Sequence, residues 1–199
     1  MTYTIHRYPA ELIDFVYVED AQRITVRPIL PQDAELMQTF FRTLSDRSRR
    51  DRFHRALREL PASLLNQLTS VDYDTHLALL AEVFVDGTEV IVGEARYVRG
   101  EGSPQAEFAM AVAEDWQAKG LGRLLLSHLE RRAVAAGIEV LFGRTLPGNR
   151  VMQALARKTG FEIVPDMDEP DTIRLQKCIG APGDRSLAGL HLHPRSAMP

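Results

Sequence analysis

A short glycine-containing segment at residues 117–122 has the sequence Q-A-K-G-L-G and follows an apolar run over residues 108–112. Leucines at helical spacing continue from Leu121, so the segment predicts a strand that turns directly into an α-helix. The first N–H groups of a helix lack intrahelical partners, and the helix dipole places about half a positive charge there. Such a turn can hold a pyrophosphate, because Gly120 and Gly122 let a ligand approach the backbone. The alternative is a glycine-bearing helix start without a ligand.

Two other classes of binding protein fit the sequence poorly. The Rossmann pattern G-x-G-x-x-G is not met, because Leu125 stands where its third glycine belongs. The formal net charge of -3 over 199 residues argues against a strongly basic nucleic-acid binder.

No apolar run approaches the roughly 20 residues that span a bilayer, and the N-terminal segment does not resemble a signal peptide. A single cysteine, Cys178, cannot form an internal disulfide, so we expect a cytoplasmic protein.

The hydrophobic periodicity predicts the order of the elements. Strands are expected at 24–29, 77–85, 89–97, 106–113, 140–145, 161–164 and 172–178. Helices are expected at 31–44, 45–60 and 61–68, from the glycine turn to Gly137, and at 149–159. Residues 1–21 carry apolar side chains without a clear period. The segment from Gly180 onward is rich in Gly, Pro, Ser and Arg, and we expect it to be disordered.

The hexapeptide resembles the Q/R-x-x-G-x-G/A signature of the GNAT superfamily of acyl-CoA-dependent N-acyltransferases. Residues 149–161, N-R-V-M-Q-A-L-A-R-K-T-G-F, are similar to the GNAT helix that an asparagine opens and a Gly-Phe pair closes. The resemblance implies an α/β GNAT fold, with a mixed central sheet of about six to seven strands, helices on both faces and a splayed strand pair at the cofactor site. It divides the chain into an N-terminal extension (1–21), a GNAT acyltransferase domain (22–178) and a tail (179–199).

The resemblance also implies acetyl-CoA as a co-substrate. Backbone groups of Met110, Ala111 and Val112 are expected to hold its pantetheine arm and thioester. The pyrophosphate is expected at the turn and the start of the helix, namely at Gln117, Ala118, Lys119, Gly120, Leu121, Gly122 and Arg123. Asn149 is expected to touch the pantetheine arm, and a plain helix N-cap is the alternative role, which can coexist with it.

Acetyl transfer to an amine requires a base, because a lysine ammonium has a pKa of ~10.4. Many GNAT enzymes carry a catalytic glutamate near the position of Glu107, which has apolar neighbours that could desolvate its carboxylate and raise its pKa. A solvent-facing glutamate is the alternative, and Glu94 and Glu82 are the other candidate bases. The position at which many GNAT enzymes have an acidic tyrosine is Ala156. A thiol pKa of ~8.5 makes the thiolate a tolerable leaving group without that acid.

A third segment, T-L-S-D-R-S-R-R-D-R-F at residues 43–53, is similar to the GNAT domain of Pat-type bacterial protein lysine acetyltransferases. The resemblance implies a protein lysine as acceptor, with an acyl-CoA synthetase as one candidate partner. A small-molecule amine and a catalytically silent acyl-CoA-binding module remain the alternatives. The arginines of this region could bind acidic groups of a partner or the 3'-phosphate of the cofactor, or form i,i+4 pairs on a solvated helix. No metal site is predicted, although His191 and His193 form an H-x-H in the tail. A homodimer is left open.

Overall fold

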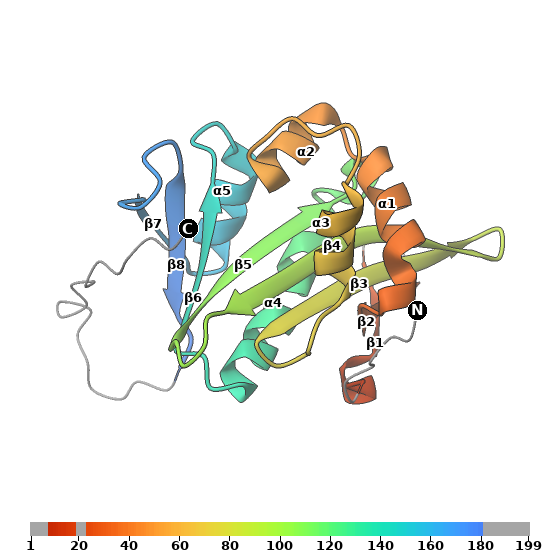
Figure 1. Cartoon of the computed structure of the whole chain (residues 1–199), viewed down its shortest axis with the longest axis horizontal. Helices are drawn as coiled ribbons and strands as arrows, with labels where there is room; N and C mark the ends of the chain where they lie inside the picture. Colours follow the sequence, from red (N-terminus) through yellow and green to blue (C-terminus); the bar gives the residue numbers. More distant parts are fainter. Residues whose placement is uncertain (1–7, 19–22, 181–199) are drawn as a thin grey trace.

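The computed structural model of the protein describes residues 8–18 and 23–180. Its strands form one sheet in the order β1-β2-β3-β4-β5-β6-β8-β7 (Figure 1). They are β1 (Asp14–Tyr17), β2 (Arg23–Pro28), β3 (His76–Val85), β4 (Thr88–Arg99), β5 (Gln105–Val112), β6 (Val140–Thr145), β7 (Glu162–Pro165) and β8 (Ile173–Cys178). β5 and β6 pair in parallel, whereas the other neighbouring strands pair antiparallel. The mixed α/β sheet is therefore confirmed, with eight strands instead of six to seven. The tail from residue 181, together with the expectation that it is disordered, lies outside the described residues.

The additional strand, β1, comes from the N-terminal segment that shows no period in the sequence. It pairs antiparallel with β2, with Asp14 opposite Val26 and Tyr17 opposite Arg23. β1 lies at the edge of the sheet, where Phe15 and Tyr17 are 54% and 67% exposed. Only Val16 of this four-residue strand is half-buried against the core, so β1 needs no alternation of apolar and polar residues, which explains the absent pattern. The sheet thus begins before residue 22, the expected start of the domain.

Helices cover both faces of the sheet, as the resemblance implies (Figure 1). They are α1 (Ala34–Thr43), α2 (Asp46–Phe53), α3 (Ala62–Thr69), α4 (Leu121–Ala135) and α5 (Arg150–Lys158). Successive side chains of a strand point to opposite faces. On β4, a Cβ built on Gly93 would lie 2.9 Å from Cδ1 of Leu125 in α4, whereas Glu94 lines a pocket with Met37 and Phe41 of α1. α1 and α4 therefore lie on opposite faces of the sheet.

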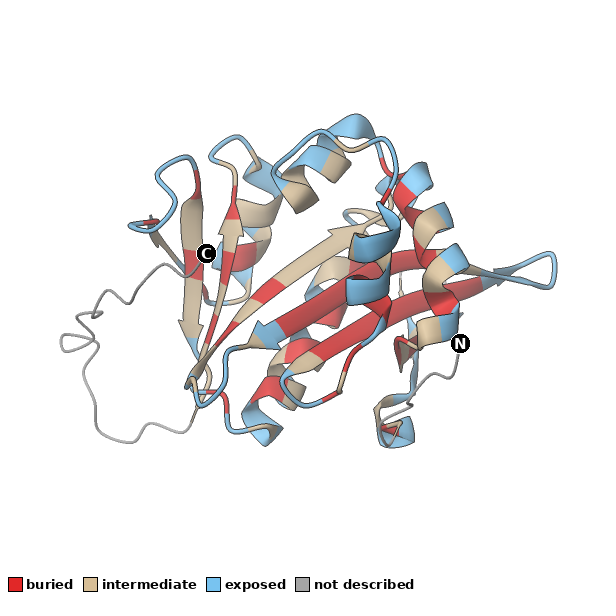
Figure 2. Ribbon diagram, viewed as in Figure 1, coloured by how far each residue is buried: buried red, intermediate tan, exposed pale blue. Residues whose placement is uncertain are grey.

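The centre of the core lies along β3, β4 and α4. β3 and β4 are buried over most of their length, in contrast to the outer strands β7 and β8 (Figure 2). α4 contributes leucines that are fully buried, among them Leu121, Leu125 and Leu129. Its end is closed as the sequence predicts, because Gly137 adopts a left-handed φ of +73°. The glycine turn that precedes α4 is thus attached to the best-packed part of the molecule.

The second predicted helix is shorter than expected. The sequence predicts helix over residues 45–60, but α2 ends at Phe53, and His54 adopts a left-handed φ of 54° with its N–H donating to the carbonyl of Arg50 at 2.8 Å. α2 buries none of its residues, so no apolar stripe extends the helix further. Its start is conventional, because the side chain of Ser45 accepts a hydrogen bond from the N–H of Ser48.

Candidate active site

The expected strand splay lies between β5 and β6. The two strands pair at only three positions, Gln105 with Val140, Ala106 with Leu141 and Glu107 with Phe142. β5 then continues to Val112 and β6 to Thr145 without further pairing between them. The β5 backbone beyond Glu107 therefore presents polar groups that no neighbouring strand uses on that side, and such an edge can bind an extended ligand.

The residues expected to hold the pantetheine arm lie on this unpaired part of β5. A Cβ built on Gly122 would lie 3.5 Å from Cε of Met110 and 3.9 Å from Cγ2 of Val112, so both side chains point toward α4. Ala111, between them, lines the pocket on the opposite face of the sheet. The splay is thus bordered by the Met110 and Val112 side chains on one face and by the small Ala111 side chain on the other.

The turn between β5 and α4 has an unusual backbone. Ala118 and Gly120 both adopt left-handed φ angles, +60° and +86°. Only a few per cent of non-glycine residues have positive φ, and such residues concentrate at functional sites. A Cβ on Gly120 would meet no heavy atom within 4 Å, so space does not limit the residue at this position. Its left-handed backbone conformation is what favours glycine. A Cβ on Gly122 would make ordinary contacts, the nearest at 3.4 Å to Leu155. Open space therefore borders the start of α4.

Three side chains of the turn region have identifiable roles or positions. Nε2 of Gln117 donates to the carbonyl of Val112 at 3.0 Å and ties the turn to the end of β5. Nζ of Lys119 lies 5.7 Å from the ring centroid of Trp116. Arg123 is exposed in the first turn of α4, so two cations accompany the helix N-terminus. The arrangement suits a polyanion, because the charges and the helix dipole have the same sign.

Asn149 serves as the N-cap of α5. Its Oδ1 accepts a hydrogen bond from the N–H of Met152 at 3.0 Å, which is the plain structural role considered for it. Its contact with the pantetheine arm stays a prediction. Ala156, at the position of the missing tyrosine, is fully buried on α5.

Glu107 lies at the point where β5 and β6 separate, since it forms the last pair between them. Its side chain is 43% exposed, and Oε2 accepts a hydrogen bond from Nη1 of Arg144 at 2.9 Å. The expected desolvation is therefore not observed. Val98 is paired with Glu107 on β4 and is itself 48% exposed, so no helix covers this part of the sheet face. The apolar neighbours of Glu107 in the sequence do not desolvate it, because Ala106 and Phe108 are buried on the other face.

Arg144, which the sequence analysis did not single out, connects Glu107 to the β7–β8 connection. Its Nε donates to Oδ2 of Asp166 at 2.8 Å, and its Nη2 lies 3.4 Å from Oδ2 of Asp168. Burial lowers the pKa of the Arg144 guanidinium, but the carboxylates of Glu107 and Asp166 outweigh burial and raise its pKa above the usual range. Arg144 is 37 residues from Glu107 in the chain, and only the β5–β6 pairing brings the two together.

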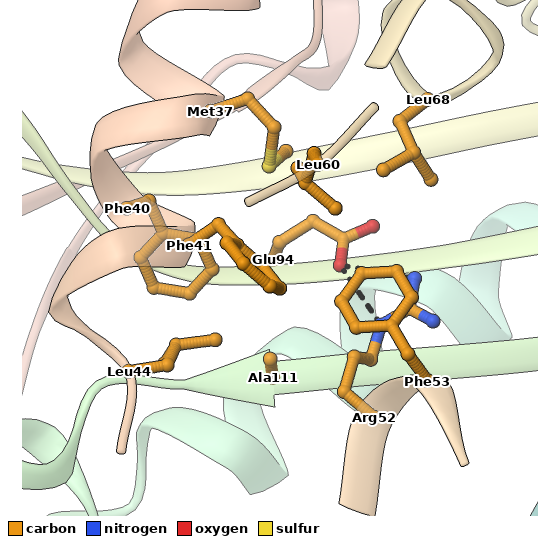
Figure 3. A pocket seen from close by; sticks show the side chains of 10 residues that line it. All are labelled: Met37, Phe40, Phe41, Leu44, Arg52, Phe53, Leu60, Leu68, Glu94 and Ala111. Atoms are coloured by element: carbon orange, nitrogen blue, oxygen red, sulfur yellow. Dashed lines mark hydrogen bonds and ion pairs between the residues drawn. The ribbon is translucent and has the colours of Figure 1, made fainter. Parts of the chain in front are cut away.

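Glu94, an alternative base, is buried in a pocket on the α1 face (Figure 3). The pocket has about 240 Å³ of empty space, part of it open to solvent, and is lined by Met37, Phe40, Phe41, Leu44, Arg52, Phe53, Leu60, Leu68, Glu94 and Ala111. The Glu94 carboxylate is paired with Arg52 at 3.4 Å and with Arg96. Burial raises the pKa of Glu94, but the two guanidinium groups outweigh it and hold the pKa below the usual range. Arg52 engages one carboxylate oxygen of the buried Glu94 and Arg96 engages the other, so Glu94 offers no free oxygen to an acceptor amine.

Glu82, the other alternative, is buried on β3 and is hydrogen-bonded to Arg27 of β2. Burial raises the pKa of Glu82 above its usual range even though Arg27 lowers it. β3 is separated from β5 by β4, so Glu82 does not border the splay. Of the three candidate glutamates, Glu107 alone combines a position at the splay with an accessible carboxylate.

The arginines of α2 are divided between structural pairing and solvent. Arg47 pairs with Asp51 at 3.7 Å and Arg49 with Asp46 at 3.6 Å, as expected for a solvated helix. Arg52 instead reaches the buried Glu94. Further arginines are exposed around α2, namely Arg50, Arg55 and Arg58.

The following two findings concern residues 8–18 and 23–180. In that part of the chain, no group of three or more His, Cys, Asp and Glu side chains is arranged to hold a metal ion. The helices found in the same residues are too short or too polar to cross a membrane.

Comparison with known proteins identifies the family. The profile of the Acetyltransferase (GNAT) family matches residues 36–161. The chain is 32% identical over 152 residues to "Acetyltransferase PA5475" of Pseudomonas aeruginosa, covering 76% of this chain and 82% of that protein. It is 29% identical over 146 residues to "Acetyltransferase Pat" of Mycolicibacterium smegmatis, covering 73% of this chain and 43% of Pat. The chain thus spans less than half of the length of Pat.

A smaller overlap relates the chain to an acetyltransferase named for a small molecule. "L-methionine sulfoximine/L-methionine sulfone acetyltransferase" of Pseudomonas aeruginosa is 31% identical over 117 residues, which cover 56% of this chain and 67% of that protein. Among solved structures, the GNAT domain of S. lividans PAT superimposes with a TM-score of 0.79 at 26% identity, covering 86% of this chain and 99% of that domain. GNAT acetyltransferases take their acetyl group from acetyl-CoA. The chain therefore belongs to the GNAT family and is an acyl-CoA N-acyltransferase.

Proposed function

We propose that the protein transfers the acetyl group of acetyl-CoA to the side-chain amine of a lysine in another protein. The observation that carries the acetyl-CoA part of the proposal is the splay itself. β5 and β6 separate immediately after Glu107, and the β5 edge beyond it leads into the turn at the N-terminus of α4. A ligand with an extended arm and a pyrophosphate fits this continuous path.

The described residues suit the two parts of coenzyme A. The unpaired β5 backbone at Met110, Ala111 and Val112 offers N–H and C=O groups to the amides of the pantetheine arm. The pyrophosphate is assigned to the turn at 117–120 and the first N–H groups of α4, where Gly120 leaves open space. Bound acetyl-CoA would supply the thioester carbonyl that the amine attacks.

Glu107 is assigned as the base. Its carboxylate lies at the root of the splay and is accessible to an acceptor, because its side chain is 43% exposed. Taking the proton from the ammonium, directly or through a water, generates the neutral amine that the reaction needs. With Ala156 buried at the usual tyrosine position, the thiolate leaves without an acid from α5, which its pKa of ~8.5 permits.

The acceptor assignment rests on the similarity to two Pat proteins. Both Pat of M. smegmatis and the GNAT domain of S. lividans PAT resemble this chain over most of its length. By the same resemblance, an acyl-CoA synthetase is one candidate acceptor protein. The exposed arginines around α2 provide positive charge that suits an acidic surface on such a partner. The 31% identity to the methionine sulfoximine acetyltransferase favours a small-molecule amine as the second candidate.

The experiment that separates these functions measures thiol release from acetyl-CoA by the purified protein. The acceptors are a folded acyl-CoA synthetase, a lysine peptide, a polyamine and methionine sulfone. We expect release with the folded protein, together with a lysine acetylation detected by mass spectrometry. Release with the small amines alone would contradict the protein acceptor and support the second candidate. The protein could instead bind acetyl-CoA, release no thiol with any of these acceptors and acetylate nothing in a screen of a cell lysate. That result would indicate a catalytically silent binding module.

A further inference from the structure

Arg144 bridges the two strands that diverge at the splay. Glu107 is the last residue of β5 that pairs with β6, and its partner there is Phe142. Arg144 lies two residues further along β6. The Arg144 guanidinium spans the opening between the strands and reaches Oε2 of Glu107 at 2.9 Å. Within residues 8–18 and 23–180, no second hydrogen bond or ion pair engages the Glu107 carboxylate. Oε1 therefore remains available while Oε2 is held.

Arg144 is itself hydrogen-bonded to a second, buried carboxylate, that of Asp166. The Asp166 side chain is only 1% exposed, and its Oδ2 accepts from Nε of Arg144 at 2.8 Å and from the hydroxyl of Thr172 at 3.1 Å. Its Oδ1 accepts from the N–H groups of Asp168 and Glu169 at 3.0 and 3.2 Å. Two backbone N–H groups and the Thr172 hydroxyl, all from the β7–β8 connection, hold Asp166 in addition to Arg144, so its position does not depend on Arg144 alone.

The geometry points to Arg144 as the positioning residue of Glu107, with Asp166 fixing the guanidinium so that one carboxylate oxygen is held at the splay and the other is free to meet the amine. This inference rests on the proposed role of Glu107 as base. Because Glu107 is accessible and lies on an uncovered sheet face, packing does not restrict its rotamers. A planar guanidinium, held at Nε and donating from Nη1, can restrict them instead.

The test is a double-mutant cycle on the full chain with Glu107→Gln and Arg144→Gln. If Arg144 acts through Glu107, Arg144→Gln lowers kcat by about 10²-fold, as a misplaced catalytic group does, and leaves the Kd for acetyl-CoA unchanged. In the Glu107→Gln background, Arg144→Gln should then change kcat by less than about threefold, because no base remains to be positioned. Losses that multiply would overturn the inference while leaving Glu107 as base. A Glu107→Gln variant with wild-type kcat would remove the base assignment and this inference together.

Two further variants separate positioning from charge and from folding. Arg174 lies opposite Arg144 on β8, and its guanidinium stacks 3.7 Å from the Phe142 ring without contacting Glu107. Arg174→Gln removes the same charge from the same sheet face, and we expect kcat within about twofold of wild type. Arg144→Lys keeps a charge beside Asp166, but one ammonium cannot reproduce the fork between two carboxylates. We expect it to fold with a wild-type melting temperature and a reduced kcat. Wild-type kcat in folded Arg144→Lys, or equal losses in Arg144→Gln and Arg174→Gln, would contradict the positioning role.

Discussion

At the scale of single residues, Glu107 provides the sharpest prediction. Glu107→Gln keeps the shape of the side chain and its acceptor oxygen for Arg144, so the fold and the acetyl-CoA affinity should be nearly unchanged. Turnover should fall by about 10²–10⁴-fold, as general-base loss typically causes. The defect should shrink as the pH rises toward the ~10.4 pKa of the acceptor amine, because more acceptor arrives neutral.

The measurement is kcat against pH for the wild type, Glu107→Gln and Glu162→Gln. Glu162 is an exposed glutamate on the edge strand β7 and serves as the matched control, with turnover expected to equal that of the wild type. A defect of equal size at every pH would indicate that Glu107 places the acceptor and does not deprotonate it. Wild-type turnover in Glu107→Gln would direct attention to Glu94 or Glu82.

Gly120 allows the anion site to be tested by charge alone. Its φ of +86° is tolerated by asparagine and aspartate better than by other side chains, and a Cβ there meets no neighbour. Gly120→Asn and Gly120→Asp therefore introduce side chains of nearly the same shape, of which only the aspartate carries a negative charge. The aspartate variant should bind acetyl-CoA at least about tenfold more weakly than the asparagine variant, because like charges near a protein surface repel by about 1–4 kcal/mol. Equal dissociation constants, measured by calorimetry in folded variants, would remove the pyrophosphate from this turn.

At the scale of elements, the sequence predicts helices and strands that have a local pattern of apolar residues, and it misses features that depend on contacts with other parts of the chain. Alternation of apolar residues identified β2, and continuous apolar runs joined by a hairpin signal identified β3 and β4. Asn149 and Gly137 marked helix ends that the structure confirms. β1 carried no alternation because it is an exposed edge strand. The end of α2 at Phe53 depends on the left-handed conformation of His54, for which histidine gives no strong local signal. The partner of Glu107 could not be predicted, since it follows from strand pairing.

The attachment of α2 leads to a prediction on stability. α2 has no fully buried residue; its Phe53 ring packs against Phe41 of α1, and its Arg52 pairs with the buried Glu94, which also neutralises Arg96. Glu94→Gln would leave two guanidinium groups near a site that no longer carries a carboxylate. Removing one partner of a buried ion pair typically costs about 3–5 kcal/mol. We expect a loss of that order in the free energy of unfolding, measured with urea.

The control is an ion pair on the surface of the same helical region. Arg42 and Glu59 form a pair at 2.8 Å with both side chains more than half exposed, so Glu59→Gln should change the free energy of unfolding by about 0–1 kcal/mol. A Glu94→Gln variant as stable as Glu59→Gln would show that the Arg52 contact does not secure α2.

At the scale of the whole molecule, the fold class was predictable because two sequence motifs resemble those of the GNAT family and the order of elements along residues 22–178 agrees with the GNAT fold. The charged groups inside the fold were not predictable in the same way. Arg96 and Glu94 are buried on β4, and Arg96 also contacts the imidazole of His76 on β3. The sequence shows that charged residues interrupt an apolar strand, but it does not show which side chains neutralise those charges in the fold. The buried charged groups affect how stability depends on pH.

His76 makes that dependence testable. Burial and the positive charge of Arg96 outweigh the carboxylates of Glu94 and Asp72 and lower its pKa to about 4, against an ordinary value of 6.5. Between these values the unfolded chain binds a proton that the folded chain does not, so stability rises with pH across this window. The contribution of His76 is therefore fully present above about pH 6.5 and is lost as the pH falls toward 4. It amounts to at most about 3 kcal/mol, and to less where solvent screens the imidazole.

The experiment compares the free energy of unfolding at pH 7 and pH 4.5 for the wild type, His76→Gln and His54→Asn. Glutamine retains an acceptor for Arg96 but does not titrate, so His76→Gln should lose less stability between the two pH values than the wild type. His54→Asn controls for the removal of an exposed histidine, because His54 lies at a left-handed φ that asparagine tolerates. The pKa of His128 is also lowered by burial and by Arg131, and its share of the pH dependence cancels because all three proteins retain it. Equal losses in the wild type and His76→Gln would mean that His76 titrates alike in the folded and unfolded chain.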